Sequence, residues 1–281
     1  MTAQPLAQPV DHAGPIIDSL TIAPLGHAEA GALARVELGR FLALLESLGP
    51  EEWERRTMCS AWSVRDILAH QAGAYSAGAS FAEFRRQFSQ KVPPGRELID
   101  VVNALQIADR AGRAPAELLA ELREMGPRAI AARQRLPWLL RHMPMPLPPL
   151  GLRPVGYLTD AVFLRDTWSH RVDVSYATGR PPLLSADHDG RFTALIVRDL
   201  APRLAPRLGG ATVLLELDGP AGGRFRLGRA AAPAATVALD AIDFHLRASA
   251  RISAEQALAR SRVSGDEALA TRALQHTFVL Y

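Results

Sequence analysis

The sequence predicts an all-α unit followed by a smaller α+β unit. Residues 28–180 carry successive apolar patterns of helical period, separated by glycine and proline breaks. Residues 181–281 mix helical patterns with stretches that alternate between apolar and polar residues, as in "ATVLLELDGPAGGRFRLG" at 211–228. The chain has 281 residues, 48% of them hydrophobic and 22% charged, which suffices for packed cores and argues against disorder.

Helical patterns follow one another through the first unit. Residues 1–27 are rich in Pro, Ala and Gly without a clear period, and we expect them to form an N-terminal extension. The pattern at 27–48 stops at Gly49 and Pro50, because proline cannot continue a helix. Ser63 begins a capping-box-like S-x-x-D, which predicts a helix to about residue 90 that its glycine-containing middle can interrupt. The remaining expectations are helices at 96–111 and 114–142, a proline-rich loop at 143–154, and a helix at 156–178 that Gly179 ends.

The second unit is expected to open with a helix at 185–207. Two strands around a glycine-rich turn follow at 211–228, and "AATVALD" at 234–240 predicts a third strand. A short helix is expected at 241–251, and a strand that leads into a closing helix at 261–280. The predicted domains are therefore the extension at 1–27, the helical bundle at 28–180 and the α+β domain at 181–281.

Charge and cysteine content exclude several classes of protein. A net charge of +3 is too small to indicate a nucleic-acid partner without a concentrated basic patch. Cys59 is the single cysteine, so no intrachain disulfide is possible, which fits a reducing cytosol. No apolar run approaches the ~20 residues needed to cross a bilayer, and the N-terminus lacks a signal-peptide pattern. We expect a cytoplasmic protein, monomeric or homodimeric, without a nucleic-acid or membrane partner.

Three ionisable residues share one face of the helix at 156–178. Asp166, His170 and Asp173 occupy positions i, i+4 and i+7, which stacks them among apolar neighbours. Either the three groups pair with one another, or a ligand beside them compensates the cost of desolvation. An Asp–His pair at this spacing is also common as a simple surface contact.

His70 is a candidate partner from another helix. It shares a face with Gly73, Ala74 and Ala77, and these small neighbours should leave space beside the imidazole. Two imidazoles and one carboxylate form a ligand set suited to zinc or a similar divalent ion, with one position open for water or substrate. Asp173 could then accept a hydrogen bond from the ring N–H of a ligand, or bind an arginine. The alternative is that His70 is a core histidine bonded to a carbonyl.

Two segments resemble the mycothiol-dependent maleylpyruvate isomerase family. "TMCSAWSVRDILAHQAG" at 57–73 is similar to its T-x-C-x-x-W-S/T-V-x-D-I/V/L-x-A-H motif, and "DTWSHRVDVSYATGR" at 166–180 to its second signature. "VSGDEALATRAL" at 263–274 resembles the G-D-x-x-L-A ending of its C-terminal domain. The resemblance implies a DinB-like four-helix bundle followed by a sterol-carrier-like α+β domain.

The resemblance also implies a ligand set and a cosubstrate. Carried over to this chain, the metal ligands are His70, Asp166 and His170, with zinc as the expected ion and mycothiol as the thiol. Asp166 stands where the isomerase has Glu, and this shorter ligand can shift or weaken the bound ion. Arg251 is a candidate for binding a carboxylate of the thiol or substrate, with a structural ion pair as its alternative. We expect Trp62 to pack in the core and Cys59 to be a buried structural thiol.

The leading functional hypothesis is a metal-dependent enzyme that uses mycothiol, either an isomerase or an S-transferase, and acts on a small electrophilic metabolite. The catalytic role then rests with the metal site. One alternative is a bundle that binds a small molecule or a protein without turnover, having lost tight metal binding. A further alternative is a metal-free catalyst in which His70 acts as the base.

Overall fold

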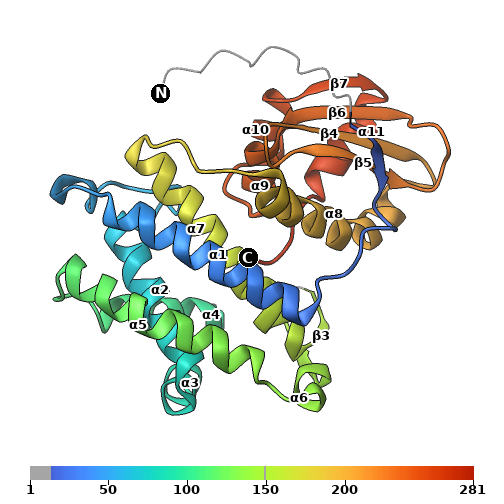
Figure 1. The fold of residues 1–281 in the computed structure, drawn as a ribbon. Helices are drawn as coiled ribbons and strands as arrows, with labels where there is room; N and C mark the ends of the chain where they lie inside the picture. The colour runs from blue at the N-terminus through green and yellow to red at the C-terminus, as the bar shows by residue number, and fades with distance from the viewer. Residues whose placement is uncertain (1–13, 149) are drawn as a thin grey trace. The chain divides into compact units, whose positions relative to one another are not determined.

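The computed structural model describes residues 14–148 and 150–281, which fall into two compact units (Figure 1). The helical unit contains Leu25–Leu183 together with Tyr281. The α+β unit contains Leu184–Leu280 and the N-terminal segment up to Pro24. The predicted fold class, a helical unit followed by a mixed α+β unit, is confirmed.

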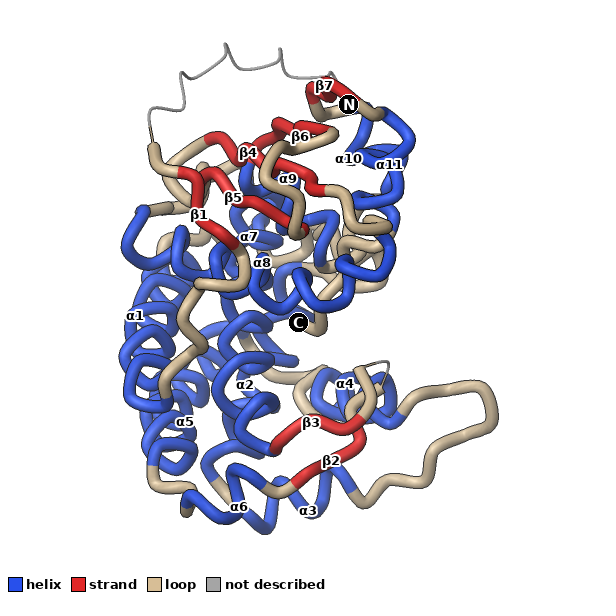
Figure 2. Tube along the Cα trace, turned by 90° about the vertical axis from the view of Figure 1, so that its right-hand side faces the viewer, coloured by secondary structure: helices blue, strands red, loops and turns tan. Residues whose placement is uncertain are grey.

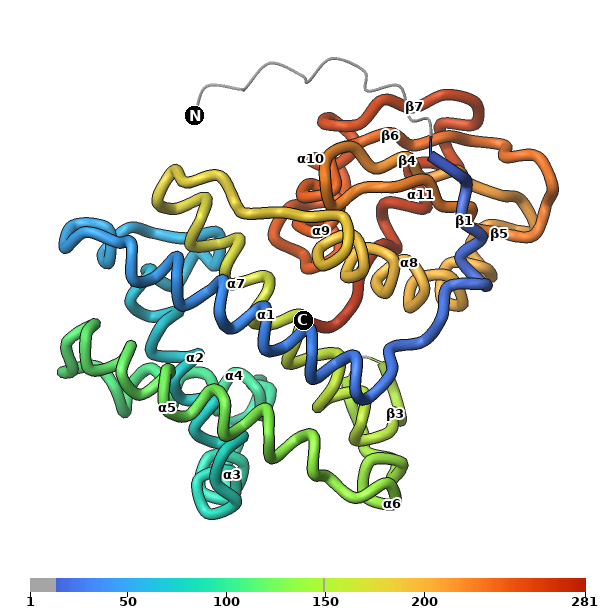
Figure 3. Tube along the Cα trace, in the orientation of Figure 1, coloured from blue at the N-terminus to red at the C-terminus, as the bar shows by residue number. Residues whose placement is uncertain are grey.

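Long helices build the core of the helical unit. They are α1 (His27–Glu46), α2 (Val64–Ala79), α5 (Pro115–Gln134) and α7 (Phe163–Thr178). α2 packs along α5, and α1 contacts both α5 and α7 (Figures 1 and 3). Fully buried side chains line these contacts, among them Phe41 of α1, Ile67 of α2 and Leu118 of α5. α1 and α5 each bury one face, as the periodic apolar pattern predicts, whereas α2 and α7 are buried on most sides.

Two of the predicted helices are broken into shorter ones. The helix expected to reach residue 90 stops at Ser80, whose backbone is extended and whose hydroxyl accepts a hydrogen bond from the Glu83 N–H. The helix expected at 114–142 is interrupted before Pro137. The shorter helices are α3 (Phe81–Phe88), α4 (Leu98–Ala108) and α6 (Trp138–His142), with a 3₁₀ turn at Pro50–Glu52.

The proline-rich stretch that precedes α7 forms a small hairpin where the sequence predicts a loop. β2 (Pro144–Pro146) and β3 (Leu152–Pro154) pair antiparallel, with Met145 opposite Arg153. A two-stranded ribbon tolerates proline because each strand has a free edge that needs no N–H donor. The helix expected at 156–178 begins with a π-helical turn at Tyr157–Val162 before α7.

The α+β unit is built on a mixed sheet with the strand order β1-β5-β4-β6-β7 (Figure 2). β5 pairs antiparallel with β4, β6 runs parallel to β4, and β7 pairs antiparallel with β6. Its strands are β1 (Ile16–Asp18), β4 (Thr212–Asp218), β5 (Gly223–Gly228), β6 (Ala235–Asp240) and β7 (Arg262–Gly265). Its helices are α8 (Arg191–Leu204), α9 (Ala241–Ala248), α10 (Ala254–Ala259) and α11 (Glu267–Gln275), with short turns at Ala186–Gly190 and Ala205–Arg207.

β1 differs from the expectation for the N-terminus. The sequence predicts a loose extension over residues 1–27, of which 1–13 lie outside the described residues. Ile16–Asp18 instead pairs parallel with β5, and Arg226 of β5 forms an ion pair with Asp18. This pairing joins segments about two hundred residues apart, which local periodicity does not reveal. No helix in the described part of the chain is long and apolar enough to cross a membrane.

Candidate metal centre

α2 places His70 inside the helical unit. The predicted capping box forms at the start of α2: the Ser63 hydroxyl accepts a hydrogen bond from the Asp66 N–H, and the Asp66 carboxylate accepts one from the Ser63 N–H. His70 lies almost two turns further along and is 4% exposed. The N-terminus of α2 is therefore fixed close to the imidazole.

α7 brings Asp166 and His170 to the same point as His70. Asp166 Oδ2 lies 3.4 Å from His70 Nε2, and Asp166 Oδ1 lies 3.3 Å from His170 Nε2. One ligand atom from each residue falls within 4.8 Å of the others. Two imidazole nitrogens and a carboxylate that converge in this way are a donor set that fits zinc or a similar divalent ion.

The outer nitrogen of each imidazole has a polar partner. His170 Nδ1 donates to Asp173 Oδ2 at 3.0 Å, so the structure brings Asp173 to the position that the sequence predicts for it. His70 Nδ1 lies 2.7 Å from Gln106 Oε1. Such outer partners orient metal-binding histidines.

The three clustered groups perturb one another's protonation. Burial would raise the pKa of Asp166, but the charges of His170 and His70 and their hydrogen bonds outweigh it and hold that pKa well below the usual value. Burial would lower the pKa of His170, but the charge of Asp166, together with the hydrogen bonds that His170 makes with Asp166, Asp173 and Cys59, raises that pKa well above the usual value. Without an ion, the pair is therefore a carboxylate facing an imidazolium, and a metal ion must displace that proton.

Three residues around the cluster have roles that the sequence did not indicate. Trp62, predicted to be core, is half-buried, and its ring centroid lies 4.9 Å from that of His70 and 5.7 Å from that of His170. Gln71 Nε2 donates to Asp166 Oδ2 at 2.5 Å. Gln106 fills the space that the sequence predicts beside the His70 imidazole. No spacing pattern in the sequence links Gln106 to His70. Gln71 could have been considered, because it directly follows His70 in the sequence.

A second group of possible ligands shares His170. Cys59, His170 and Asp173 also bring one ligand atom each within 4.8 Å of one another. The Cys59 thiol donates to Asp173 Oδ2 at 3.5 Å and is half-buried, where a buried thiol was predicted. Asp173 already accepts hydrogen bonds from His170 Nδ1 and from the Cys59 thiol, so these groups are occupied with one another. The set of His70, Asp166 and His170 is therefore the better candidate for binding a metal ion.

A small hollow adjoins Asp166 on the side of α5. It is lined by Gln71, Tyr75, Arg133, Phe163 and Thr167, among others. The Arg133 guanidinium lies 5.3 Å from the ring centroid of Tyr75 and 5.1 Å from that of Phe163. The two aromatic rings hold the Arg133 guanidinium beside the cluster, where its positive charge could attract an anionic group.

Arg251, the predicted carboxylate-binding residue, belongs to the α+β unit. It is half-buried in the turn between α9 and α10, directly after Ala250, which has a positive φ of 59°. Its backbone N–H donates to the Leu246 carbonyl. A role for Arg251 in binding substrate or thiol stays a prediction.

Comparisons with known proteins agree with this architecture. The family model described as the mycothiol maleylpyruvate isomerase N-terminal domain matches residues 34–175, half of the chain. A crystal structure of the mycothiol-dependent maleylpyruvate isomerase is similar with a TM-score of 0.55 and 16% identity, over 81% of this chain and 90% of that one. The crystal structure of a mutant of that isomerase is similar with a TM-score of 0.56 and 16% identity, over 86% of this chain and 95% of that one. No curated protein sequence matches this chain. The chain belongs to the mycothiol maleylpyruvate isomerase family of enzymes.

Proposed function

We propose that this protein is a metal-dependent enzyme that uses mycothiol to isomerise a small electrophilic metabolite, or that acts as an S-transferase and joins mycothiol to it through sulfur. The ion, zinc in the first instance, would be held by His70, Asp166 and His170. The observation that carries the proposal is the convergence of two Nε2 atoms on the two oxygens of one carboxylate. Membership of the family supports mycothiol as the thiol.

The chain's own residues would prepare the site. Asp173 orients the His170 ring, Gln71 orients the Asp166 carboxylate, and Trp62 covers the two imidazoles. A divalent ion bound there would favour the thiolate form of the cosubstrate at neutral pH, and the thiolate is the reactive nucleophile. Arg133 lines the hollow beside Asp166, so its charge would attract an anionic group of the electrophile, and we expect a carboxylate-bearing substrate.

Isomerase and S-transferase activities would share the first step. The thiolate sulfur adds to one carbon of an activated double bond, and the electron pair of that bond moves onto the adjacent carbonyl. In an isomerase, rotation about the resulting single bond and expulsion of the thiolate release the other isomer. In an S-transferase, the adduct takes up a proton and leaves as the product. We place this chemistry in the cytoplasm, which the single cysteine supports.

Metal analysis of the purified protein and of single-site variants tests the proposal. We expect about one divalent ion per chain, lost in His70→Ala and His170→Ala and kept in His142→Ala, an exposed histidine of α6 that serves as the matched control. Incubation with mycothiol and maleylpyruvate or another unsaturated acid should show turnover that depends on both thiol and metal. A protein without metal, whose stability is indifferent to chelators, would instead indicate the non-catalytic binding bundle.

A further inference from the structure

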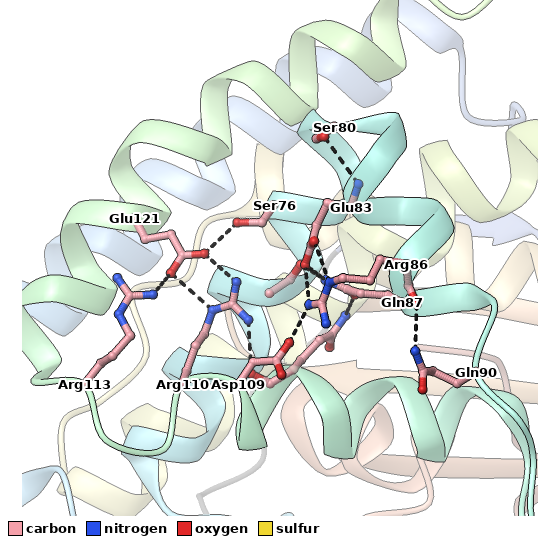
Figure 4. Close-up of polar contacts among 12 residues, drawn as sticks. Ser76, Ser80, Glu83, Arg86, Gln87, Gln90, Asp109, Arg110, Arg113 and Glu121 are labelled. Atoms are coloured by element: carbon pink, nitrogen blue, oxygen red, sulfur yellow. Dashed lines mark hydrogen bonds and ion pairs between the residues drawn. The ribbon is translucent and has the colours of Figure 1, made fainter.

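A chain of buried amide side chains runs from His70 to two hydrogen-bond acceptors. His70 Nδ1 lies 2.7 Å from Gln106 Oε1, and Gln106 Nε2 lies 2.7 Å from Gln87 Oε1. Gln87 Nε2 then donates to the Gly73 carbonyl at 3.1 Å and to Glu83 Oε1 at 2.9 Å. Figure 4 shows Gln87 beside Glu83 on α3. Gln87 is fully buried and Gln106 is 3% exposed, so this chain is shielded from water.

The far end of this chain determines its direction. A backbone carbonyl can only accept a hydrogen bond, so Gln87 must present its NH₂ group to Gly73. Glu83 is also an acceptor, because hydrogen bonds from Arg86 lower its pKa to about 2. The Gln87 oxygen must therefore face Gln106, which in turn must present its NH₂ group to Gln87 and its oxygen to His70. Reversing either amide would bring two donors or two acceptors face to face at 2.7 Å.

The direction of the chain selects one tautomer of His70. Because Gln106 offers an oxygen, Nδ1 must carry a proton, and the neutral ring then leaves its lone pair on Nε2, which points at Asp166. Asp166 alone would favour the opposite tautomer, since a carboxylate 3.4 Å from Nε2 attracts a proton there. Building on the metal site proposed above, we propose that Gln106 and Gln87 are positioning residues that hold His70 in the tautomer whose Nε2 can bind the ion.

Packing around Gln106 fixes it against the imidazole. A Cβ on Gly73 would lie 2.7 Å from both Cβ and Cγ of Gln106, so only glycine lets the amide come this close to α2. Arg110 donates to the Gln106 carbonyl at 3.2 Å and forms an ion pair with the half-buried Glu121. Figure 4 shows Ser76, Arg110 and Arg113 converging on Glu121, which ties α2 and the end of α4 to α5.

Two measurements test this inference on the full chain. The first is nitrogen-15 NMR of the His70 ring in the metal-free protein, at a pH where free imidazoles are neutral. We expect Nδ1 to be protonated and Nε2 to be unprotonated in the wild type, and the Nε2–H tautomer to prevail in Gln106→Leu, which has no acceptor. The second is the affinity for Zn²⁺, measured by competition with a chelator. Outer-shell partners typically change metal affinity by about 10–100-fold, and we expect a loss of that size in Gln106→Leu.

Matched variants separate tautomer control from packing. Gln106→Glu with its carboxyl group protonated keeps an oxygen for Nδ1 and an O–H for Gln87 Oε1, so it should bind Zn²⁺ within a few-fold of the wild type. Val102→Ala lies one turn earlier on α4, is fully buried, and should lower thermal stability without changing Zn²⁺ affinity. Equal losses of affinity in Val102→Ala and Gln106→Leu would overturn the inference. An unprotonated Nδ1 in the wild type would also overturn it, even if Gln106→Leu does not fold. A wild type that binds no Zn²⁺ would refute the metal site. The NMR measurement on the metal-free protein would still show which nitrogen of His70 carries the proton.

Discussion

Replacing Asp166 by asparagine removes the one carboxylate that lies between His70 and His170. Asp166 interacts with the two imidazoles at 3.4 Å and 3.3 Å and accepts from Gln71 at 2.5 Å. Loss of a direct ligand should exceed the effect of an outer-shell partner, so we expect Zn²⁺ affinity to fall at least about 100-fold, or about 2.7 kcal/mol.

The same substitution should destabilise the metal-free protein within a defined pH window. Asp166 has a lowered pKa, so its contribution to stability is present above its ordinary pKa of 3.8 and is lost as the pH falls through its folded-state pKa. His170 has a raised pKa, so its contribution is complete below its ordinary pKa of 6.5 and is lost as the pH rises through its folded-state pKa. Hydrogen bonds to charged groups contribute about 1.5–3 kcal/mol each. Because Asp166 is 21% exposed, we expect a net loss of only about 1–3 kcal/mol between these limits.

Urea unfolding with a chelator present and Zn²⁺ competition without it measure the two effects. Asp160→Asn is the matched control, because Asp160 is a buried carboxylate that pairs with Arg141 and His27 outside the cluster. This control should unfold more easily and keep wild-type Zn²⁺ affinity. Asp166→Asn with Zn²⁺ affinity within threefold of wild type would refute Asp166 as a ligand.

Three further changes have expected outcomes. The pKa of Glu83 is lowered from 4.5 to about 2, so its contribution to stability is present above pH 4.5 and is lost as the pH falls through about 2. In Glu83→Gln, acid unfolding should lack the part of the pH dependence that comes from this carboxylate. Gly73→Ala would overpack Gln106 at a cost of about 1–3 kcal/mol, against a gain in helix propensity of about 1 kcal/mol, and urea unfolding should show a net loss. Arg133→Met should raise KM for a carboxylate-bearing electrophile more than for its ester, and equal changes for both would exclude recognition of the anion.

The cluster could be predicted from sequence because its members follow short-range rules. Asp166 and His170 are one helical turn apart, and their spacing places them together on whatever helix they occupy. The S-x-x-D pattern fixed the start of α2 and hence the position of His70 along it. No spacing joins position 70 to position 166. The expectation that α2 and α7 meet came from the packing of helices in a bundle, and the family resemblance supported it.

Other features depend on contacts between distant segments. Gln106 reaches His70 from α4, thirty-six residues away, and nothing in the pattern of that helix indicates this. The small residue at Gly73 correctly indicated space beside the imidazole, but a protein side chain occupies it. β1 exists because β5 offers it an edge, and the hairpin at 144–154 exists because its prolines lie where no donor is needed. Such elements depend on partners that local periodicity does not specify.

X-ray absorption of the Zn²⁺-loaded protein tests the central claim most directly. Ligation by His70, Asp166 and His170 predicts only nitrogen and oxygen neighbours, at about 2.0–2.2 Å, with the imidazole signal reduced in His70→Ala. A sulfur neighbour at about 2.3 Å that disappears in Cys59→Ser would place the ion among Cys59, His170 and Asp173 instead, and would contradict the account given for His70.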